Sequence, residues 1–448
     1  MRKIILYSLI FYTLLNLNVS LFAQIKFKVP DTYLTGNSPV NLSIGDLNGD
    51  FKPDLVVVNS KSNTVSVFFN NGSGQFGTSI DYQIGNNPYW VILNDFNNDN
   101  YLDIATSNFD SNSISILTNT GQGLFPSRRD YPVGTNPRCI YADDLNGDNK
   151  LDIVTANYES DFISILFNSD TGLQVAKSVN IGSSSIGHHA VAIKDFNEDG
   201  KKDIVVTNRG EATLSILTNS GNGALSHYQT ITIGGSGYSI VASDFNRDNK
   251  IDIASTILSE GKLSVVTNVG LNITNFRNYN TGSYPINLTT TDLTGNGYPD
   301  FIVANSNENT ISILTNSGTG VLGNKINITV GANPTDIVTG DLNGDDVIDI
   351  ATSNSGSNTI SVLFGIKEPL SNTLISYVNV EIFPNPNMGV LYIENNNYQY
   401  LPFEISNTVG VNVLKGELRL GLNELNLNLS PGIYLLKIFN LEKKIIIK

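Results

Sequence analysis

The sequence predicts an all-β protein in which a seven-bladed β-propeller with calcium loops is closed by its own N-terminal strand and followed by a small C-terminal β-sandwich. Three observations favour this fold class. An acidic phrase, DLNGDFKPDLVVVN at Asp46, returns in seven copies spaced 48 to 51 residues apart. Segments such as NTVSVFFN from Asn63 alternate apolar and polar residues, as strands do. The last copy stops after three strands at Gly365, and the missing fourth strand aligns with a segment that begins at Ile25.

The fixed period indicates a repeat architecture with one supersecondary unit per copy. A unit of about 49 residues with four short strands is typical of a propeller blade. The N-terminal segment would complete the seventh blade and remove an exposed sheet edge. A parallel β-helix would need a shorter coil, and a WD40 propeller would need Gly-His and Trp-Asp pairs that this sequence lacks.

The chain divides into four predicted segments: a signal peptide (1–23), the propeller (24–366), a linker (367–378) and a C-terminal domain (379–448). The signal peptide is predicted from two basic residues, an apolar stretch and Ala23 before a plausible cleavage point. A membrane anchor is the alternative, but asparagines interrupt the apolar run, and no other stretch approaches the roughly 20 residues of a spanning helix. We therefore expect no transmembrane segment in the mature chain.

Composition limits the class of partner. The formal net charge is −14, which argues against a nucleic-acid partner because such a partner requires a basic face. A single cysteine, Cys139, excludes an internal disulfide framework. A secreted form would then need another stabilising device.

The acidic phrase predicts calcium loops. Calcium takes six to eight oxygen ligands, and each phrase offers oxygen-bearing side chains at its positions 1, 3, 5 and 9. Position 6, where the chain must turn sharply, is Asn, Gly or Asp in six copies, and Phe51 is the exception. The loop is not an EF-hand, because position 12 is never Glu. Simple Asx turns are the alternative, but they explain one carboxylate per loop and not four oxygen donors.

These positions give the predicted metal ligands, for up to seven mainly structural Ca²⁺ ions: Asp46, Asn48, Asp50, Asp54, Asp95, Asn97, Asp99, Asp103, Asp144, Asn146, Asp148, Asp152, Asp195, Asn197, Asp199, Asp203, Asp244, Asn246, Asp248, Asp252, Asp292, Thr294, Asn296, Asp300, Asp341, Asn343, Asp345 and Asp349. The sixth loop carries neutral Thr294 and Asn296 at positions 3 and 5. We expect it to bind calcium most weakly, since affinity rises with the number of carboxylates.

The seven phrases, together with FNNGSGQFG after the third strand of the first copy, resemble FG-GAP (VCBS-type) repeats over residues 25–365. Such repeats form the calcium-loop blades of integrin α heads and of some fungal lectins. The resemblance implies a calcium-braced propeller used mostly for extracellular binding. It does not fix the ligand.

The C-terminal segment resembles the sorting domain of type IX secretion cargo in Gram-negative bacteria. The likeness rests on the Pro-Asn-Pro turn at Pro384–Pro386, the strand start Gly432-Ile433-Tyr434 and the terminal lysines. A generic small sandwich is the alternative. The resemblance implies recognition by the type IX secretion machinery, and a protein released from the cell or held at its outer surface.

Variable positions indicate where recognition could occur. Loops that vary on a rigid scaffold commonly carry binding, and the residue six before each first Asp differs among copies: Val40, Tyr89, Arg138, His189, Tyr238, Ile286 and Thr335. With their neighbours, they give six candidate ligand-binding residues: Tyr89, Trp90, Arg138, His188, His189 and Tyr238. Aromatic residues beside Arg suit sugar stacking or a protein hot spot. The alternative is that these side chains only fill the mouth of the channel.

The sequence therefore predicts a secreted or cell-surface calcium-binding propeller that acts as a monomeric adhesion or binding module for glycans or surface proteins. An extracellular polysaccharide lyase or hydrolase, with His189 or Arg138 acting on the substrate, is the second hypothesis. Three histidines and no activated thiol offer little for acid–base catalysis. No catalytic residue is assigned.

Overall fold

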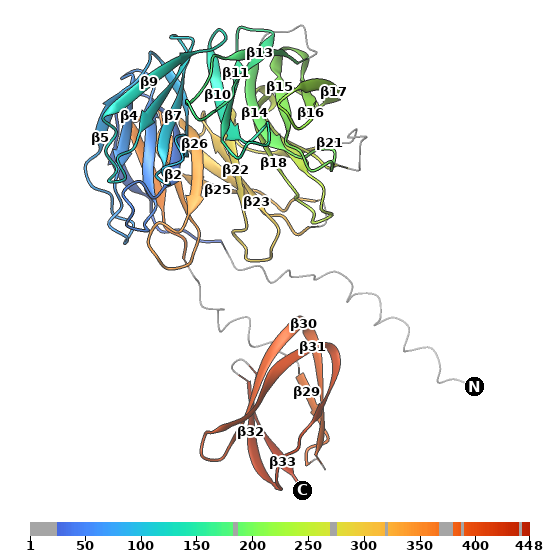
Figure 1. Ribbon diagram of the computed structural model, residues 1–448. Coiled ribbons are helices and arrows are strands. Elements are labelled where there is room, and N and C mark those ends of the chain that lie inside the picture. Colours follow the sequence, from blue (N-terminus) through green and yellow to red (C-terminus); the bar gives the residue numbers. More distant parts are fainter. Residues whose placement is uncertain are drawn as a thin grey trace. The chain divides into compact units, whose positions relative to one another are not determined.

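The computed structural model describes residues 25–181, 187–268, 276–318, 321–366, 380–386, 389–438 and 441–448. The chain forms two compact units that meet in sequence between Lys367 and Glu368 (Figure 1). The predicted signal peptide and linker lie outside the described residues.

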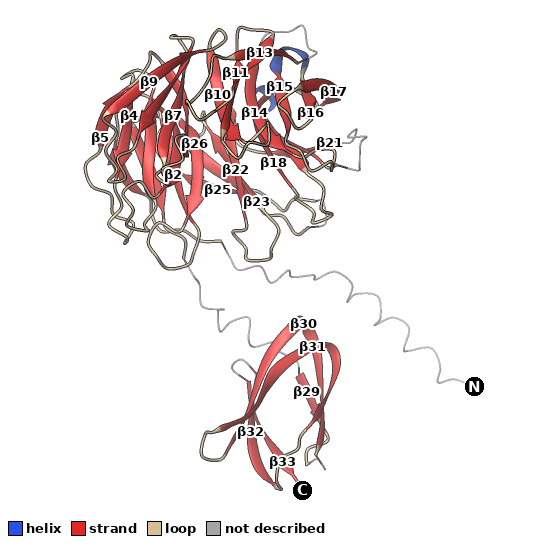
Figure 2. Ribbon diagram, viewed as in Figure 1, coloured by secondary structure: helices blue, strands red, loops and turns tan. Residues whose placement is uncertain are grey.

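The first unit contains seven four-stranded antiparallel sheets (Figure 2). Six of them are built from consecutive strands. The first holds β2 (Pro39–Gly45), β3 (Asp54–Asn59), β4 (Thr64–Phe68) and β5 (Ile80–Gln83). The second holds β6 (Pro88–Asn94), β7 (Asp103–Asn108), β8 (Ser113–Thr118) and β9 (Ser127–Pro132). The third holds β10 (Pro137–Asp143), β11 (Asp152–Asn157), β12 (Phe162–Leu166) and β13 (Lys177–Asn180).

The next three sheets follow the same order. The fourth holds β14 (His188–Lys194), β15 (Asp203–Asn208), β16 (Thr213–Asn219) and β17 (Leu225–Thr232). The fifth holds β18 (Gly237–Ser243), β19 (Asp252–Ile257), β20 (Lys262–Val266) and β21 (Phe276–Asn280). The sixth holds β22 (Pro285–Thr291), β23 (Asp300–Asn305), β24 (Thr310–Leu314) and β25 (Ile326–Thr329). Two short 3₁₀ helices, η1 (Arg209–Glu211) and η2 (Leu258–Glu260), link second to third strands.

The seventh sheet joins the two ends of the unit. It holds β26 (Pro334–Gly340), β27 (Asp349–Asn354), β28 (Thr359–Leu363) and, from the N-terminal end, β1 (Asp31–Leu34). Asp31 lies opposite Val362 and Leu34 opposite Thr359 in an antiparallel pair. The N-terminal strand thus completes the last sheet, as the sequence predicted.

The first strands of neighbouring sheets contact one another around a ring. Each touches the next in order from β2 to β26, and β26 contacts β2. The second strands are buried at every residue, from β3 to β27, because apolar side chains on both faces pack between adjacent sheets. Val56 and Val58 of β3, for example, share a core with Val91 and Ile104 of the second sheet. This ring of repeated sheets is consistent with a β-propeller.

The second unit is one five-stranded sheet made of β29 (Val380–Phe383), β30 (Val390–Asn407), β31 (Asn412–Asn426), β32 (Gly432–Ile438) and β33 (Leu441–Ile447). The sequence predicted a sandwich, but the described strands belong to a single sheet. Its long strand β30 pairs with β29 in its first half and β32 in its second, and its register against β31 shifts between Asn395 and Tyr400. One hydrophobic core contains side chains from both halves of β30, such as Leu391 and Phe403, together with Ile447 of β33. In the described residues of both units, no helix is long and apolar enough to cross a membrane.

Candidate functional site

The acidic loops share one backbone geometry. In the first loop, the Asp46 carboxylate accepts the N–H of Gly49 at 2.8 Å through Oδ1 and that of Phe51 at 2.8 Å through Oδ2. The bond from position 6 to the first Asp recurs in all seven loops. The first carboxylate therefore holds the shape of its loop.

The residue at position 6 is left-handed in every loop, with φ between 60° and 83°. This confirms the expected turn at the six copies with Asn, Gly or Asp. It also holds for Phe51, which has φ 63° and is 95% exposed. Bulky residues rarely adopt this conformation, so the loop imposes its turn even on an unsuitable side chain.

The ninth-position carboxylates have a second role that the sequence analysis missed. Asp54 is fully buried, and its two oxygens accept the N–H of Leu47 at 3.0 Å and of Asn70 at 2.9 Å. Burial, with a smaller contribution from the nearby charges of Asp50 and Asp46, raises the pKa of Asp54 to about 6. The equivalent residues Asp103, Asp152, Asp203, Asp252, Asp300 and Asp349 make the same pair of main-chain contacts. These carboxylates tie each loop to the turn after the third strand.

The donor chemistry of the loops suits a hard cation, but their side chains alone do not form a complete cage. Asp46 Oδ1 also accepts the N–H of Asp50, so Oδ2, which accepts only that of Phe51, is the oxygen with a second lone pair for a ligand. Within the described part of the chain, no three His, Cys, Asp or Glu side chains are grouped closely enough to hold a metal ion. Asparagine and main-chain oxygens would have to complete each calcium shell. Calcium binding stays a prediction.

An asparagine after the third strand fastens neighbouring sheets together. Asn119 Nδ2 donates to the carbonyl of Leu47 in the preceding sheet's loop at 2.9 Å, and to Leu102 in its own sheet at 3.0 Å. Five others also bond to the preceding loop: Asn70, Asn168, Asn219, Asn268 and Asn316. Gly365 takes this position in the seventh sheet. The signal was present in the sequence as an asparagine 24 residues after the first Asp in six copies.

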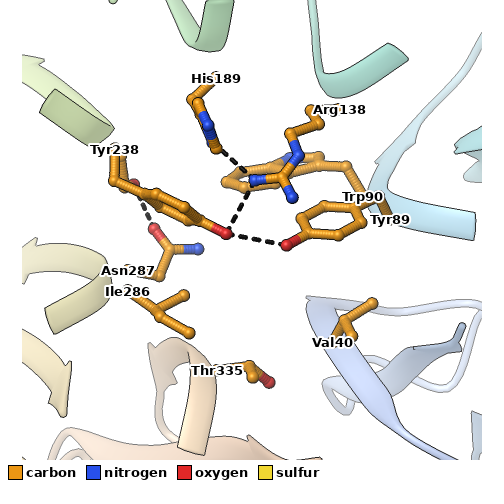
Figure 3. A pocket seen from close by; sticks show the side chains of 10 residues that line it. Val40, Tyr89, Trp90, Arg138, His189, Tyr238, Ile286, Asn287 and Thr335 are labelled. Carbon is orange, nitrogen blue, oxygen red and sulfur yellow. Dashed lines mark hydrogen bonds between the residues drawn. The ribbon is translucent and has the colours of Figure 1, made fainter. Parts of the chain in front are cut away.

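The seven variable residues of the first strands all line one pocket (Figure 3). Beside each of them, the pairing of first and second strands shifts register, and such bulges re-aim side chains. Trp90, Ser239 and Asn287 complete the lining, and the cavity has a volume of about 30 Å³, little more than a water molecule occupies.

The two sides of the pocket differ in chemistry. Tyr89, Arg138, His189 and Tyr238 come from the second to fifth sheets and are large and polar or aromatic. Val40, Ile286 and Thr335 come from the first, sixth and seventh sheets and are small. Figure 3 shows the large side chains converging while the small ones lie opposite them. The pocket therefore has one charged aromatic wall and one small, mainly apolar wall.

Arg138 lies at the centre of the charged wall. Its Nη1 is 2.6 Å from His189 Nδ1 and donates to the Tyr238 hydroxyl at 2.9 Å. Its guanidinium lies 4.2 Å from the Tyr89 ring centroid, and the Tyr89 and Tyr238 hydroxyls are 2.8 Å apart. The Arg138 Nε is buried and has no hydrogen-bond partner among the residues that the structure describes.

His189 lies between two arginines. Its Nδ1 faces Arg138, and its Nε2 lies 3.2 Å from Nη1 of Arg209. Burial and the two positive charges lower the pKa of His189 to about 2. The imidazole is therefore neutral near pH 7, and it is a weak base for catalysis there.

Five of the six predicted ligand-binding residues come together in this pocket, and His188 does not. Its ring is fully buried, with Nδ1 3.3 Å from the Thr207 carbonyl. The sequence analysis missed Phe109, Tyr158 and Arg209, which surround Arg138 and His189. Each directly follows the second strand of its sheet, at another position that varies among the copies.

A buried polar network lies beside the pocket. Asp336 Oδ2 accepts the side-chain N–H of Asn41 at 2.6 Å and the main-chain N–H of Leu42 at 2.9 Å, while Oδ1 accepts from Asn287. The Ser239 hydroxyl donates to Asn287 Oδ1. Burial raises the pKa of Asp336 to about 7. This network links four sheets and was not predicted from the sequence.

Comparison with known families agrees with the repeat pattern. The FG-GAP-like repeat matches residues 46–106, 95–155, 144–206, 195–255 and 292–352, which together cover more than half of the chain. The chain belongs to the FG-GAP-like repeat family. A secretion system C-terminal sorting domain matches residues 381–448. This FG-GAP protein therefore carries the address recognised by the type IX secretion machinery and is destined for the cell surface or the extracellular space.

Solved structures with related folds are distant in sequence from this FG-GAP protein. The N-terminal region of BBS1 in complex with ARL6 aligns with TM-score 0.56 and 15% identity, covering 77% of this chain and 98% of that one. A putative 6-phosphogluconolactonase from Bacteroides fragilis aligns with TM-score 0.52 and 13% identity, covering 87% and 98%. A periplasmic gluconolactonase from Pseudomonas aeruginosa gives 0.50 and 15%, covering 66% and 87%. At these identities the likeness concerns the fold alone. No curated protein matches the sequence.

Proposed function

We propose that the protein is a secreted or surface-attached binding module that recognises an extracellular glycan in the pocket at the centre of its ring. The seven sheets would be the blades of one closed, monomeric propeller, and calcium in the acidic loops would stabilise this scaffold. One observation carries the proposal. The positions that vary among the repeats meet in one pocket, which aromatic rings and Arg138 line.

The composition of the pocket favours binding over catalysis. Tyrosine and tryptophan rings offer flat faces for sugar stacking, whereas a catalytic base needs a pKa near the working pH. His189 lies far from that range, and no carboxylate is found among the pocket-lining residues. The lactonase names belong to distant structural neighbours and give no residue to carry over.

A glycan array with the mature chain tests this function. We expect binding to a defined set of glycans, and no turnover of acidic polysaccharides incubated with the protein. Ile286→Trp should fill the small side of the pocket and abolish binding. The matched control, Ile326→Trp, places the same side chain on the exposed strand β25 and should bind like the wild type. Polysaccharide cleavage that Ile286→Trp abolishes would show an enzyme instead.

A further inference from the structure

We infer that the pocket is a carboxylate site, and that its ligand is the acidic sugar, a uronic acid, at the end of a glycan chain. This inference rests on the proposed function and adds the charge of the ligand. It follows from an imbalance between donors and acceptors on the charged wall.

The positive charges of the wall have no negative partner. Arg138 and Arg209 lie on either side of His189, and neither forms an ion pair in the part of the chain that the structure describes. Arg138 is instead surrounded by the rings of Tyr89, Tyr158 and Tyr238, at 4.2, 5.0 and 5.4 Å. Charges in such partly buried places are normally paired. A ligand that brings a carboxylate would supply the missing charge.

Hydrogen bonding leads to the same conclusion. A neutral imidazole has one donor and one acceptor nitrogen, so His189 can accept from only one of its two arginine neighbours. The other arginine then faces the N–H of the His189 ring, so its own N–H group has no acceptor on that side. The buried Nε of Arg138 lacks one as well. Carboxylate oxygens accept several N–H groups at once, and arginine binds them with matching planar geometry.

The opposite wall favours a sugar over a flexible acidic peptide. Val40, Ile286 and Thr335 leave a small recess facing Tyr89 and Tyr238 (Figure 3). The cavity of about 30 Å³ has room for the carboxylate group alone, so the sugar ring at the end of a chain would lie at its mouth. A pyranose ring could place its apolar face on tyrosine while its carboxylate meets the arginines.

Calorimetry on the mature protein tests the inference with glucuronate and galacturonate, against glucose and galactose as the same rings without the carboxylate. We expect at least one acidic sugar to bind about tenfold or more tightly than its neutral counterpart, since hydrogen bonds to charged groups are roughly twice as strong as neutral ones. Arg138→Gln should remove this preference, and Arg209→Gln should weaken it. Arg129→Gln, on the exposed strand β9, should leave it unchanged.

The outcomes separate this inference from the proposed function. Equal binding of acidic and neutral sugars overturns the carboxylate site but leaves a glycan-binding pocket. The carboxylate site is also overturned if neither uronic acid binds while the glycan array still shows binding that Ile286→Trp abolishes. That result too leaves a glycan-binding pocket. Binding of a peptide with a free C-terminal carboxylate, and of no sugar, overturns both. The wild-type sugar comparison does not depend on whether the arginine variants fold, and their melting curves identify any that do not.

Discussion

The acidic loops and the pocket residues come from the same repeats, yet one set is nearly constant and the other differs from copy to copy. In the loops, Asp46 and its equivalents bond to main-chain atoms within the same repeat. In the pocket, Tyr89 bonds to Tyr238, which lies 149 residues away. Side chains that serve the backbone of their own repeat must recur with it. Side chains that meet in the central pocket come from different repeats and are free to differ. The constant loop residues therefore maintain the scaffold, whereas the variable pocket residues are the ones suited to recognise a ligand.

The largest effect should come from removing calcium, which would destabilise the acidic loops. A ligand that binds only the native state contributes about 2.7 kcal/mol per site at a concentration of 100 Kd. With several loops occupied, excess EDTA should lower the melting temperature by roughly 10 °C or more, because about 1 kcal/mol corresponds to roughly 2–4 °C in domains of 150–250 residues and to less in larger ones. Differential scanning calorimetry with and without EDTA measures this shift, and re-added calcium is the control. An unchanged melting temperature would mean that the loops are held by their own hydrogen bonds alone.

The second largest effect on stability is expected at Asp336, which lies in the buried polar network beside the pocket. Its folded pKa of about 7 exceeds the ordinary value of 3.8, so the folded state holds the proton more tightly than the unfolded state. Its contribution to stability is complete near pH 4 and is lost as the pH rises through 7. The groups that contact its carboxylate are amides, and the nearby Cys139 thiol has a pKa raised by burial to about 12.

In calcium-saturated protein, Asp336→Asn should therefore flatten the pH dependence of the unfolding free energy, by roughly 4 kcal/mol between pH 4 and pH 8 at about 1.4 kcal/mol per pKa unit. The measurement is urea unfolding at a series of pH values. Asp110→Asn, at an exposed position, is the matched control. Parallel curves for wild type and Asp336→Asn would contradict the burial argument.

Asn119→Ala should lower the stability by a smaller amount, because it removes a single side chain that is hydrogen-bonded between two neighbouring sheets. The carbonyls of Leu47 and Leu102 would lose their shared donor, and an unsatisfied buried polar group costs about 1–3 kcal/mol. Chemical denaturation measures the loss, with the exposed Asn86→Ala as control. Equal stability of the two variants would show that water replaces the asparagine.

The smallest effect is expected at the sixth loop. Asn296→Asp would restore the carboxylate at position 5, but Asn296 Nδ2 now donates to the Asn316 carbonyl at 2.8 Å. The gain in charge is therefore partly offset by a lost hydrogen bond. At limiting calcium, we expect weaker anomalous density in the Asp292 loop than in the other six, and stronger density in the variant. Equal density at all seven wild-type loops would show that charge does not order these sites.

The sequence allowed much of the fold to be predicted, because its strongest signals are local and periodic. The 49-residue spacing indicated the sheets, and the shortened last copy indicated the closing strand β1. The left-handed turn at position 6 was predicted from Asn and Gly. At Phe51 the turn follows from the geometry of the loop rather than from the side chain.

The interactions that were missed join residues from different repeats or serve two purposes. Asp54 was assigned to metal alone, although its buried oxygens bind main-chain N–H groups. The Asp336 network joins strands about 295 residues apart, a distance over which no periodic pattern carries information. Arg209 was missed although it lies in the same sheet as His189, because it follows the second strand and only the variable positions of the first strands were considered. The pocket could be outlined from the sequence, but its charge balance required the structure.

The pairing of β1 with β28 has a kinetic consequence. Asp31 and Val362 are so far apart in sequence that their contact closes the longest loop in the ring, and such contacts form late because the entropy of closure must be overcome first. Until then, β28 presents unpaired N–H and C=O groups to any passing strand. The nascent chain is thus most vulnerable to aggregation and proteases at its seventh sheet, and a chaperone that shields this edge would protect the whole molecule.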